Sequence, residues 1–265
     1  MSTISVNGTT LYYDAAGHGL PIVFIHGMCG NADVWADQVA RLSPRFRCVT
    51  YDRRGHTRSA LGHIAARTVE LHADDTAALI QGLALAPCLL VGSSGGARVG
   101  LDVVRRYPEL LRGAVLSEPP VLALDPEGAR AFMNEIKPNI ERAVAAGGAA
   151  AAVDAFFEVV CPGLWRTLPE AARDRYRANQ IELFGDLQMP PYKVSREDLA
   201  RIQCPCLVVS GSESHPVLRR VAQIVADAIP GCRSVELTGS GHVTYYERPA
   251  EFAAAVRAFA DTVVR

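Results

Sequence analysis

CLLVGSSGGARVG, residues 88–100, joins an apolar run to a helical pattern through a turn made only of glycine and serine. A Gly-x-Ser-x-Gly motif at such a junction is typical of a nucleophilic serine, because the sharp turn lifts the side chain above the edge of a sheet. Glycines flank the serine because a Cβ at those positions would clash. The following helix directs its positive end at the serine oxygen. The motif therefore predicts that Ser94 is a nucleophile.

Apolar runs of strand length alternate with helical patterns on both sides of this motif. The runs predict strands at residues 21–25, 47–51, 88–91, 113–116, 206–210 and 233–237. Apolar residues at helical spacing predict helices at 32–42, 69–83, 97–107, 216–229 and 250–263. Asn7-Gly8 separates two alternating runs and favours a β-hairpin with a type I′ turn. The pattern predicts an α/β fold with a doubly wound, mostly parallel sheet and helices on both faces.

Residues 121–199 interrupt this alternation. The segment contains no convincing strand, is rich in alanine and is too long for a simple crossover. We interpret it as a helical lid over the sheet, with residues 1–120 and 200–265 forming the α/β core. Some of its large apolar side chains are expected to line a pocket and others to form the lid's own core. They are Phe132, Met133, Phe156, Phe157, Trp165, Phe184, Met189 and Tyr192.

The loop His26-Gly27-Met28-Cys29-Gly30 follows the apolar run at residues 21–25. A loop of this composition can leave a backbone N–H unpaired at the edge of the sheet. Acyl transfer passes through a tetrahedral oxyanion that backbone N–H groups stabilise. We expect the oxyanion hole to be formed by the N–H groups of Met28 and of Gly95, the residue after the nucleophile. His26 is expected to brace the loop.

The general base is expected late in the chain, on a loop at the same edge of the sheet. Gly239-Ser240-Gly241-His242 follows the last predicted strand and meets both conditions. His215 also follows a predicted strand and is the alternative. We therefore predict His242 as the base, with His215 as its rival.

The order of these motifs, together with DRRGHTRS at residues 52–59, resembles the α/β-hydrolase superfamily over nearly the whole chain. Thr57 departs from the pattern, since relatives usually carry glycine there. The resemblance implies a hydrolase that uses Ser94 for acyl chemistry, because relatives acting on alkyl halides or epoxides need aspartate at this position. The expected reaction is cleavage of a carboxylic ester or lactone through an acyl-enzyme. Perhydrolysis, C–C bond hydrolysis and a ligand receptor on the same fold are the alternatives.

The acidic partner of the base is expected at one of two strand ends. In most relatives an aspartate follows the strand equivalent to residues 206–210, but this chain has Ser214 there, beside Glu213. Glu118 ends the preceding strand, in a placement that resembles zearalenone-type lactonases and one subgroup of haloalkane dehalogenases. Pro119-Pro120 would make the Glu118 loop rigid. We predict Glu118 as the acid and keep Glu213 as the alternative.

The composition bounds the partners of the chain. Lys and Arg total 27 against 28 Asp and Glu, which gives no electrostatic reason to expect nucleic acid. No apolar run approaches the roughly 20 residues that span a bilayer, and no secretory signal is visible, so a cytoplasmic location is expected. The seven cysteines are expected to be reduced and mostly buried. A small-molecule ester or lactone is the expected partner, and no metal or organic cofactor is implied.

Overall fold

An eight-stranded sheet forms the centre of the computed structural model, which describes residues 2–63 and 67–263. Its spatial order is β1-β2-β4-β3-β5-β6-β7-β8. The β1–β2 and β2–β4 pairs are antiparallel, and the other pairs are parallel. The strands are β1 (Ser2–Val6), β2 (Thr9–Ala16), β3 (Leu20–Ile25), β4 (Phe46–Tyr51), β5 (Cys88–Ser93), β6 (Leu111–Ser117), β7 (Cys206–Gly211) and β8 (Arg233–Leu237).

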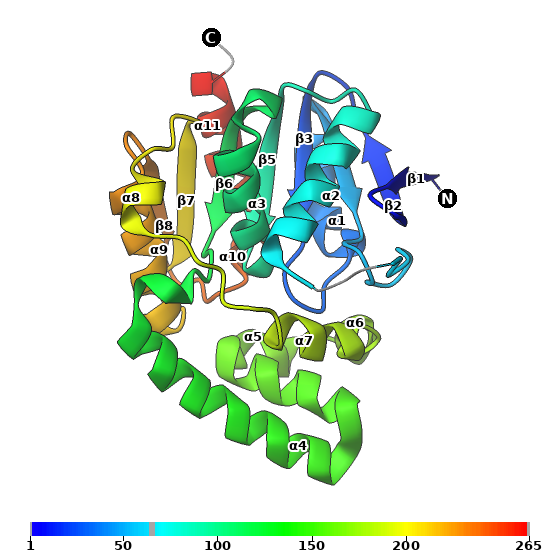
Figure 1. Cartoon of the computed structure of the whole chain (residues 1–265), viewed down its shortest axis with the longest axis vertical. Helices are drawn as coiled ribbons and strands as arrows, with labels where there is room; N and C mark the ends of the chain where they lie inside the picture. Colours follow the sequence, from blue (N-terminus) through cyan, green and yellow to red (C-terminus); the bar gives the residue numbers. More distant parts are fainter. Residues whose placement is uncertain (1, 64–66, 264–265) are drawn as a thin grey trace.

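Helices cover both faces of the sheet (Figure 1). On one face α2 and α3 pack against each other, and on the other α1 packs against α11. The helices of the core are α1 (Ala36–Leu42), α2 (Val69–Gly82), α3 (Gly95–Arg106), α9 (Pro216–Ala228), α10 (Thr244–Glu247) and α11 (Pro249–Val263), with the 3-10 turns η1 (Ala32–Trp35) and η2 (Pro108–Leu110). The predicted doubly wound α/β fold is confirmed.

The central strands read as continuous apolar runs because both of their faces are covered. Residues 22–25 of β3 and 88–91 of β5 have no solvent exposure. A parallel strand buried on both sides needs this pattern, whereas the edge strand β1 is mostly exposed. The strong apolar runs in the sequence therefore marked the middle of the sheet.

The chain order reverses between β3 and β5, where a crevice opens beyond the carboxyl ends of the strands. The chain runs from β3 to its neighbour β4 and then crosses to β5 on the other side of β3. Loops that leave two such strands diverge, and ligands of open α/β sheets bind at this point. The loop after β3 and the serine turn after β5 both lie here.

A helical insertion lies beyond this edge of the sheet (Figure 1). It contains η3 (Leu122–Leu124), α4 (Pro126–Val160), α5 (Pro162–Thr167), α6 (Glu170–Arg177) and α7 (Gln180–Leu187). The short α8 (Arg196–Leu199), which follows in the chain, packs instead against α9 of the core. The predicted helical insertion is therefore present. The exact division at residues 121–199 stays a prediction.

Helix α4 differs from the expectation that no apolar run is long enough to span a bilayer. By length and composition it is the one helix in the described part of the chain that could cross a membrane, with a mean hydropathy of 1.6 over its most apolar 18 residues. Alanine supplies much of this value. The helix is interrupted at Gly148, whose backbone angles of 76° and −166° are not helical. Residues on one side of α4, including Phe132 and Phe156, are buried against the rest of the protein.

Two local features refine the predicted elements. The Asn7-Gly8 turn has positive φ at both residues, as a type I′ hairpin requires. The helix expected from residue 97 begins at Gly95 instead, because the serine turn feeds directly into its first turn. All seven cysteines lie in the described part of the chain and are unpaired, and six of them are buried.

Candidate active site

Ser94 sits at a strained turn between β5 and α3. Its backbone angles are 54° and −124°, a conformation that ordinary residues rarely adopt. The flanking glycines explain how the chain tolerates this turn. A Cβ on Gly96 would lie 2.2 Å from the carbonyl oxygen of Ile25, and one on Gly92 would lie 2.6 Å from that of Gly96. The turn holds the Ser94 side chain at the carboxyl edge of the sheet, as predicted from the motif.

Two backbone N–H groups beside Ser94 have no acceptor in the described part of the chain. They belong to Met28 and Gly95, the predicted oxyanion donors. The two residues are close together, since a Cβ on Gly95 would lie 3.5 Å from the Met28 nitrogen. A Cβ on Gly27 would lie 3.2 Å from that of Ser94, so the loop passes directly over the serine. We name residues 26–30 the oxyanion loop.

Glu118 and His242 form a hydrogen-bonded pair. Glu118 follows β6 with a φ of 44°, and its side chain has no solvent exposure. Its Oε2 lies 2.5 Å from Nδ1 of His242. The same carboxylate accepts hydrogen bonds from the Gly211 N–H at 2.8 Å and from the Ser214 hydroxyl at 2.6 Å. These donors fix the carboxylate and so orient the imidazole with Nε2 free.

Ser214, which stands where relatives usually carry the acid, is thus a hydrogen-bond donor to Glu118, the acid predicted at the neighbouring strand. The rival residues lie elsewhere. Glu213 is exposed, and its backbone N–H donates to the Ser240 carbonyl. The His215 ring packs 4.7 Å from the Phe132 ring and lies 3.3 Å from Glu135 on α4. The structure therefore brings Glu118, and not Glu213, to His242.

Ser94 and His242 line the same two cavities. The described residues form no direct hydrogen bond between the Ser94 hydroxyl and the His242 ring. In unliganded enzymes such bonds are often long and shorten only when substrate binds. The two side chains face a common space from different loops, which is the arrangement that proton transfer between them requires.

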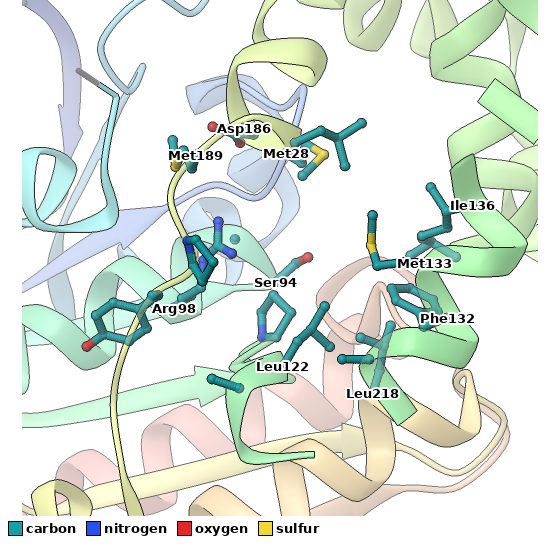
Figure 2. Close-up of a pocket in the computed structure, with 18 of the residues that line it drawn as sticks. Met28, Ser94, Arg98, Leu122, Phe132, Met133, Ile136, Asp186, Met189 and Leu218 are labelled. Carbon is teal, nitrogen blue, oxygen red and sulfur yellow. The ribbon is translucent and has the colours of Figure 1, made fainter. Parts of the chain in front are cut away.

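The larger cavity holds about 510 Å³ and lies between the sheet edge and the insertion (Figure 2). Its wall is mainly apolar, with Leu218 of α9 on the side of the core and with Leu122 of η3 and Ile136 of α4 on the side of the insertion. The smaller cavity holds about 30 Å³, room for about one water molecule. Ser94 and His242 therefore separate a large apolar space from a very small one.

The insertion supplies part of both walls, as expected. Five of the eight side chains named from the sequence line the larger cavity, and Phe157 lines the smaller one. The five are Phe132, Met133, Phe156, Met189 and Tyr192. Trp165 and Phe184 line neither. Trp165 stacks on Phe157 at a centroid distance of 4.5 Å and belongs to the insertion's own core.

A buried polar network lies behind the oxyanion loop. His26 accepts a hydrogen bond from the Arg53 N–H at 2.9 Å, while its Nδ1 lies 2.8 Å from the Gly27 carbonyl, so His26 braces the loop. The Arg53 guanidinium pairs at 2.9 Å with Asp186 of α7. Burial, reinforced by neighbouring charges, holds the pKa values of His26 and His56 well below their usual range. Both rings are therefore neutral acceptors for Arg53.

Asn179 connects the insertion to the oxyanion loop and carries no sequence motif. Its amide donates to the carbonyls of Cys29 and Gly30, each at 3.0 Å. Its Oδ1 accepts from the backbone N–H of Thr57 at 2.8 Å. Thr57 has a φ of 44°, so the threonine takes the conformation that favours glycine in relatives. Sequence reasoning missed Asn179 because its partners are about 120–150 positions away.

The described residues contain no group of three or more His, Cys, Asp or Glu side chains that could hold a metal ion. The buried Cys29 thiol lies in the oxyanion loop, but burial raises its pKa well above the ordinary value. A thiol held in its neutral form is a poor nucleophile. Cys29 is therefore not expected to compete with Ser94, the predicted nucleophile.

Comparison with known proteins gives matches over most of the chain. The sequence profile of the alpha/beta hydrolase family matches residues 22–255. A non-heme chloroperoxidase from Streptomyces lividans is 31% identical over 93% of this chain and 91% of its own length. An uncharacterised hydrolase, YraK, from Bacillus subtilis is 37% identical, but the alignment spans about half of each protein, 52%. The structure of a thermophilic esterase from Thermogutta terrifontis superimposes with a TM-score of 0.78 at 25% identity, covering 98% and 97% of the two chains.

Proposed function

This chain belongs to the alpha/beta hydrolase family, and we propose that it is a serine hydrolase that cleaves a carboxylic ester or lactone through an acyl-enzyme. The observation that carries the proposal is the buried hydrogen bond from Glu118 to His242, whose ring lines a cavity together with Ser94 and the two N–H groups that have no acceptor among the described residues. These are a nucleophile, an oriented base and an oxyanion site in one place.

The first half of the reaction acylates Ser94. His242 Nε2 accepts the hydroxyl proton as Ser94 Oγ forms a bond to the acyl carbon. Glu118 holds Nδ1–H and stabilises the imidazolium that results. The carbonyl oxygen, now an anion, accepts hydrogen bonds from the N–H groups of Met28 and Gly95. Collapse of this intermediate breaks the bond to the alcohol oxygen, which leaves with the proton from His242.

The second half returns the enzyme to its starting state. A water molecule gives a proton to His242 and attacks the acyl carbon, again placing negative charge between Met28 and Gly95. The bond to Ser94 Oγ breaks, and the oxygen recovers the proton from His242. The acid leaves. The 30 Å³ cavity beside Ser94 and His242 has room for the attacking water.

The cavities indicate an asymmetric substrate. A volume of about 510 Å³ lies within the range of about 300–1,000 Å³ that small-molecule sites occupy. The small cavity accommodates no more than a methyl-sized group or a water. The placement of Glu118 after β6 is similar to that of zearalenone-type lactonases and supports a lactone, while the Thermogutta structure is that of an esterase. We propose a small to medium, largely apolar ester or lactone.

Perhydrolysis is a second candidate, because the Streptomyces relative is a non-heme chloroperoxidase. In that reaction hydrogen peroxide takes the place of water. Its oxygen attacks the acyl-enzyme, a proton passes to His242, and a peroxy acid leaves as Ser94 recovers its proton. Since acylation is common to both routes, the two differ only in the second nucleophile.

A panel of p-nitrophenyl esters and aryl lactones, assayed with and without hydrogen peroxide, tests the proposal. We expect release of the acid without peroxide and at least a thousandfold loss of kcat in Ser94→Ala. The matched control is Ser93→Ala, which alters the neighbouring serine in β5. Undiminished turnover in Ser94→Ala, or no turnover of any ester or lactone by the folded protein, would contradict the proposal. Turnover that requires peroxide would favour the second candidate.

A further inference from the structure

Arg98 lines the larger cavity one helical turn beyond Ser94 (Figure 2). Both residues belong to the start of α3, where Ser94 is the N-cap and its backbone carbonyl accepts a hydrogen bond from the Arg98 backbone N–H at 3.0 Å. Four residues of helix advance the chain by about 6 Å, and helical side chains lean back toward the N-terminus. The Arg98 side chain therefore stands on the same helix face as the serine, toward the space that a substrate would fill.

The Arg98 guanidinium has no protein partner among the described residues. Its Nε is buried without a hydrogen-bond acceptor, and no carboxylate lies within ion-pair distance. Further along the same helix, Arg105 and Arg106 share the Asp102 carboxylate, so unpaired arginine is not a general feature of α3. Burial lowers the pKa of Arg98, which indicates that its charge is poorly compensated.

The charges around the cavity leave an excess of positive charge. Asp186 also lines the wall: its Oδ2 accepts from Arg53 at 2.9 Å, its Oδ1 has no hydrogen-bond partner among the described residues, and it forms no ion pair with Arg98. Arg130 of α4 lines the cavity from its exposed side and forms no ion pair in the described part of the chain. The remaining carboxylate near Ser94, Glu118, has no solvent exposure, lines neither cavity and is held by Gly211, Ser214 and His242. A half-buried arginine with an unpartnered buried Nε, in a mainly apolar cavity, favours an anionic partner.

We propose that Arg98 binds a carboxylate carried by the substrate, and that the preferred ester or lactone therefore has an acidic group on the side that enters the larger cavity. This proposal deepens the proposed function and rests on it. A guanidinium presents two parallel N–H donors that match the two oxygens of a carboxylate. A phosphate dianion would require further donors beside Arg98, whereas the other arginine of the wall, Arg130, lies at its exposed side. Arg98 is thus a specificity-determining residue.

A matched pair of esters measures this preference. Monoethyl adipate and ethyl hexanoate have the same reacting end and similar length, but only the first has a terminal carboxylate. We expect wild-type protein to hydrolyse monoethyl adipate with the higher kcat/KM. Arg98→Met should lower the ratio of the two kcat/KM values by about ten- to a hundredfold, as expected for hydrogen bonds between charged groups. The ratio for Arg98→Lys, which keeps the positive charge but loses the two parallel N–H donors, should lie between the ratios of wild-type protein and Arg98→Met. Arg112→Met is the control, because Arg112 is exposed on β6.

Calorimetry with adipate gives a second readout that does not depend on turnover. We expect wild-type protein to bind adipate and Arg98→Met to bind it at least tenfold more weakly. Unchanged adipate affinity in folded Arg98→Met, or no adipate binding by wild-type protein, would overturn the assignment of Arg98. If Arg98→Met does not fold, a wild-type protein that shows no preference for monoethyl adipate overturns it. Adipate binding that depends on Arg98, without hydrolysis of either ester, would support Arg98 while the proposed function fails.

Discussion

Replacing Glu118 by glutamine should remove most of the activity while leaving the fold intact. Glu118 Oε1 accepts from the Gly211 N–H, and Oε2 accepts from both Ser214 and His242. A glutamine NH2 in place of Oε1 would face the Gly211 N–H, which cannot reorient. The NH2 is therefore expected in place of Oε2, where the Ser214 hydroxyl can rotate to accept. There the NH2 group also faces Nδ1 of His242.

An NH2 group at this position forces the imidazole into the wrong tautomer. Nδ1 becomes the acceptor, the proton moves to Nε2, and Nε2 can no longer accept the proton of Ser94. In a known Ser-His-Asp triad the corresponding Asp-to-Asn change lowers kcat by about 10⁴, equal to about 5.4 kcal/mol of barrier. Glu118 has the same contact with the histidine and no solvent exposure, so we expect a loss of similar size.

The assay is steady-state hydrolysis of the best ester from the panel, with circular dichroism and thermal melting to establish folding. Glu213→Gln is the control and should retain its rate, since Glu213 is exposed and lies outside both cavities. Glu118→Ala combined with Ser214→Asp should recover part of the loss, because the Ser214 hydroxyl already lies 2.6 Å from Glu118 Oε2. A folded Glu118→Gln with the wild-type rate, or loss of activity in Glu213→Gln alone, would refute this reasoning.

Two further predictions concern the surroundings of the site. Asn179→Ala should lower kcat by about ten- to a hundredfold with little change in KM, because the loop that presents an oxyanion donor loses two buried hydrogen bonds and one well-placed donor is worth about 2.7–4 kcal/mol. Equal rates in this variant and in the control Asn139→Ala, which alters a partly exposed asparagine of α4, would contradict the role. The free energy of unfolding should fall as the pH drops below about 6.5, because burial holds the pKa values of His26 and His56 well below the unfolded value and that of His72 at about 3. Below pH 6.5 the unfolded chain binds more protons than the folded one, which lowers the free energy of unfolding by up to about 1.4 kcal/mol per pH unit for each histidine. Urea denaturation at pH 7 and pH 5.5 measures this change. Equal midpoints at the two pH values would show that these rings are not buried in neutral form.

The sequence predicted the parts of this protein that depend on short stretches of chain. Period and composition marked the strands, because a parallel strand covered on both faces is continuously apolar. The turn around Ser94 was recognisable because Gly92 and Gly96 meet backbone atoms at distances that exclude a Cβ. The oxyanion loop follows a strongly apolar run in the sequence and could therefore be placed at the same edge of the sheet as Ser94.

Features that depend on contacts between distant segments were not predictable from the sequence. Asn179 lies between two helices of the insertion, and nothing in its neighbourhood indicates that it reaches the oxyanion loop. The role of Ser214 as donor to Glu118 could not be derived either, since it depends on how close the loops after β6 and β7 come. Arg98 lies in the helix predicted at residues 97–107 and belongs to no motif that indicates a role. Its missing partner becomes evident only when the wall of the cavity is known.

Mapping the adduct of a fluorophosphonate probe tests the central claim, that Ser94 is the nucleophile of this hydrolase. The probe reacts with a serine only when a base and an oxyanion site activate it. We expect one labelled peptide in the mass spectrum, with the phosphonyl group on Ser94, and no labelling of Ser94→Ala or of heat-denatured protein. An adduct on any other residue, or labelling of Ser94→Ala to the wild-type extent, would contradict the account.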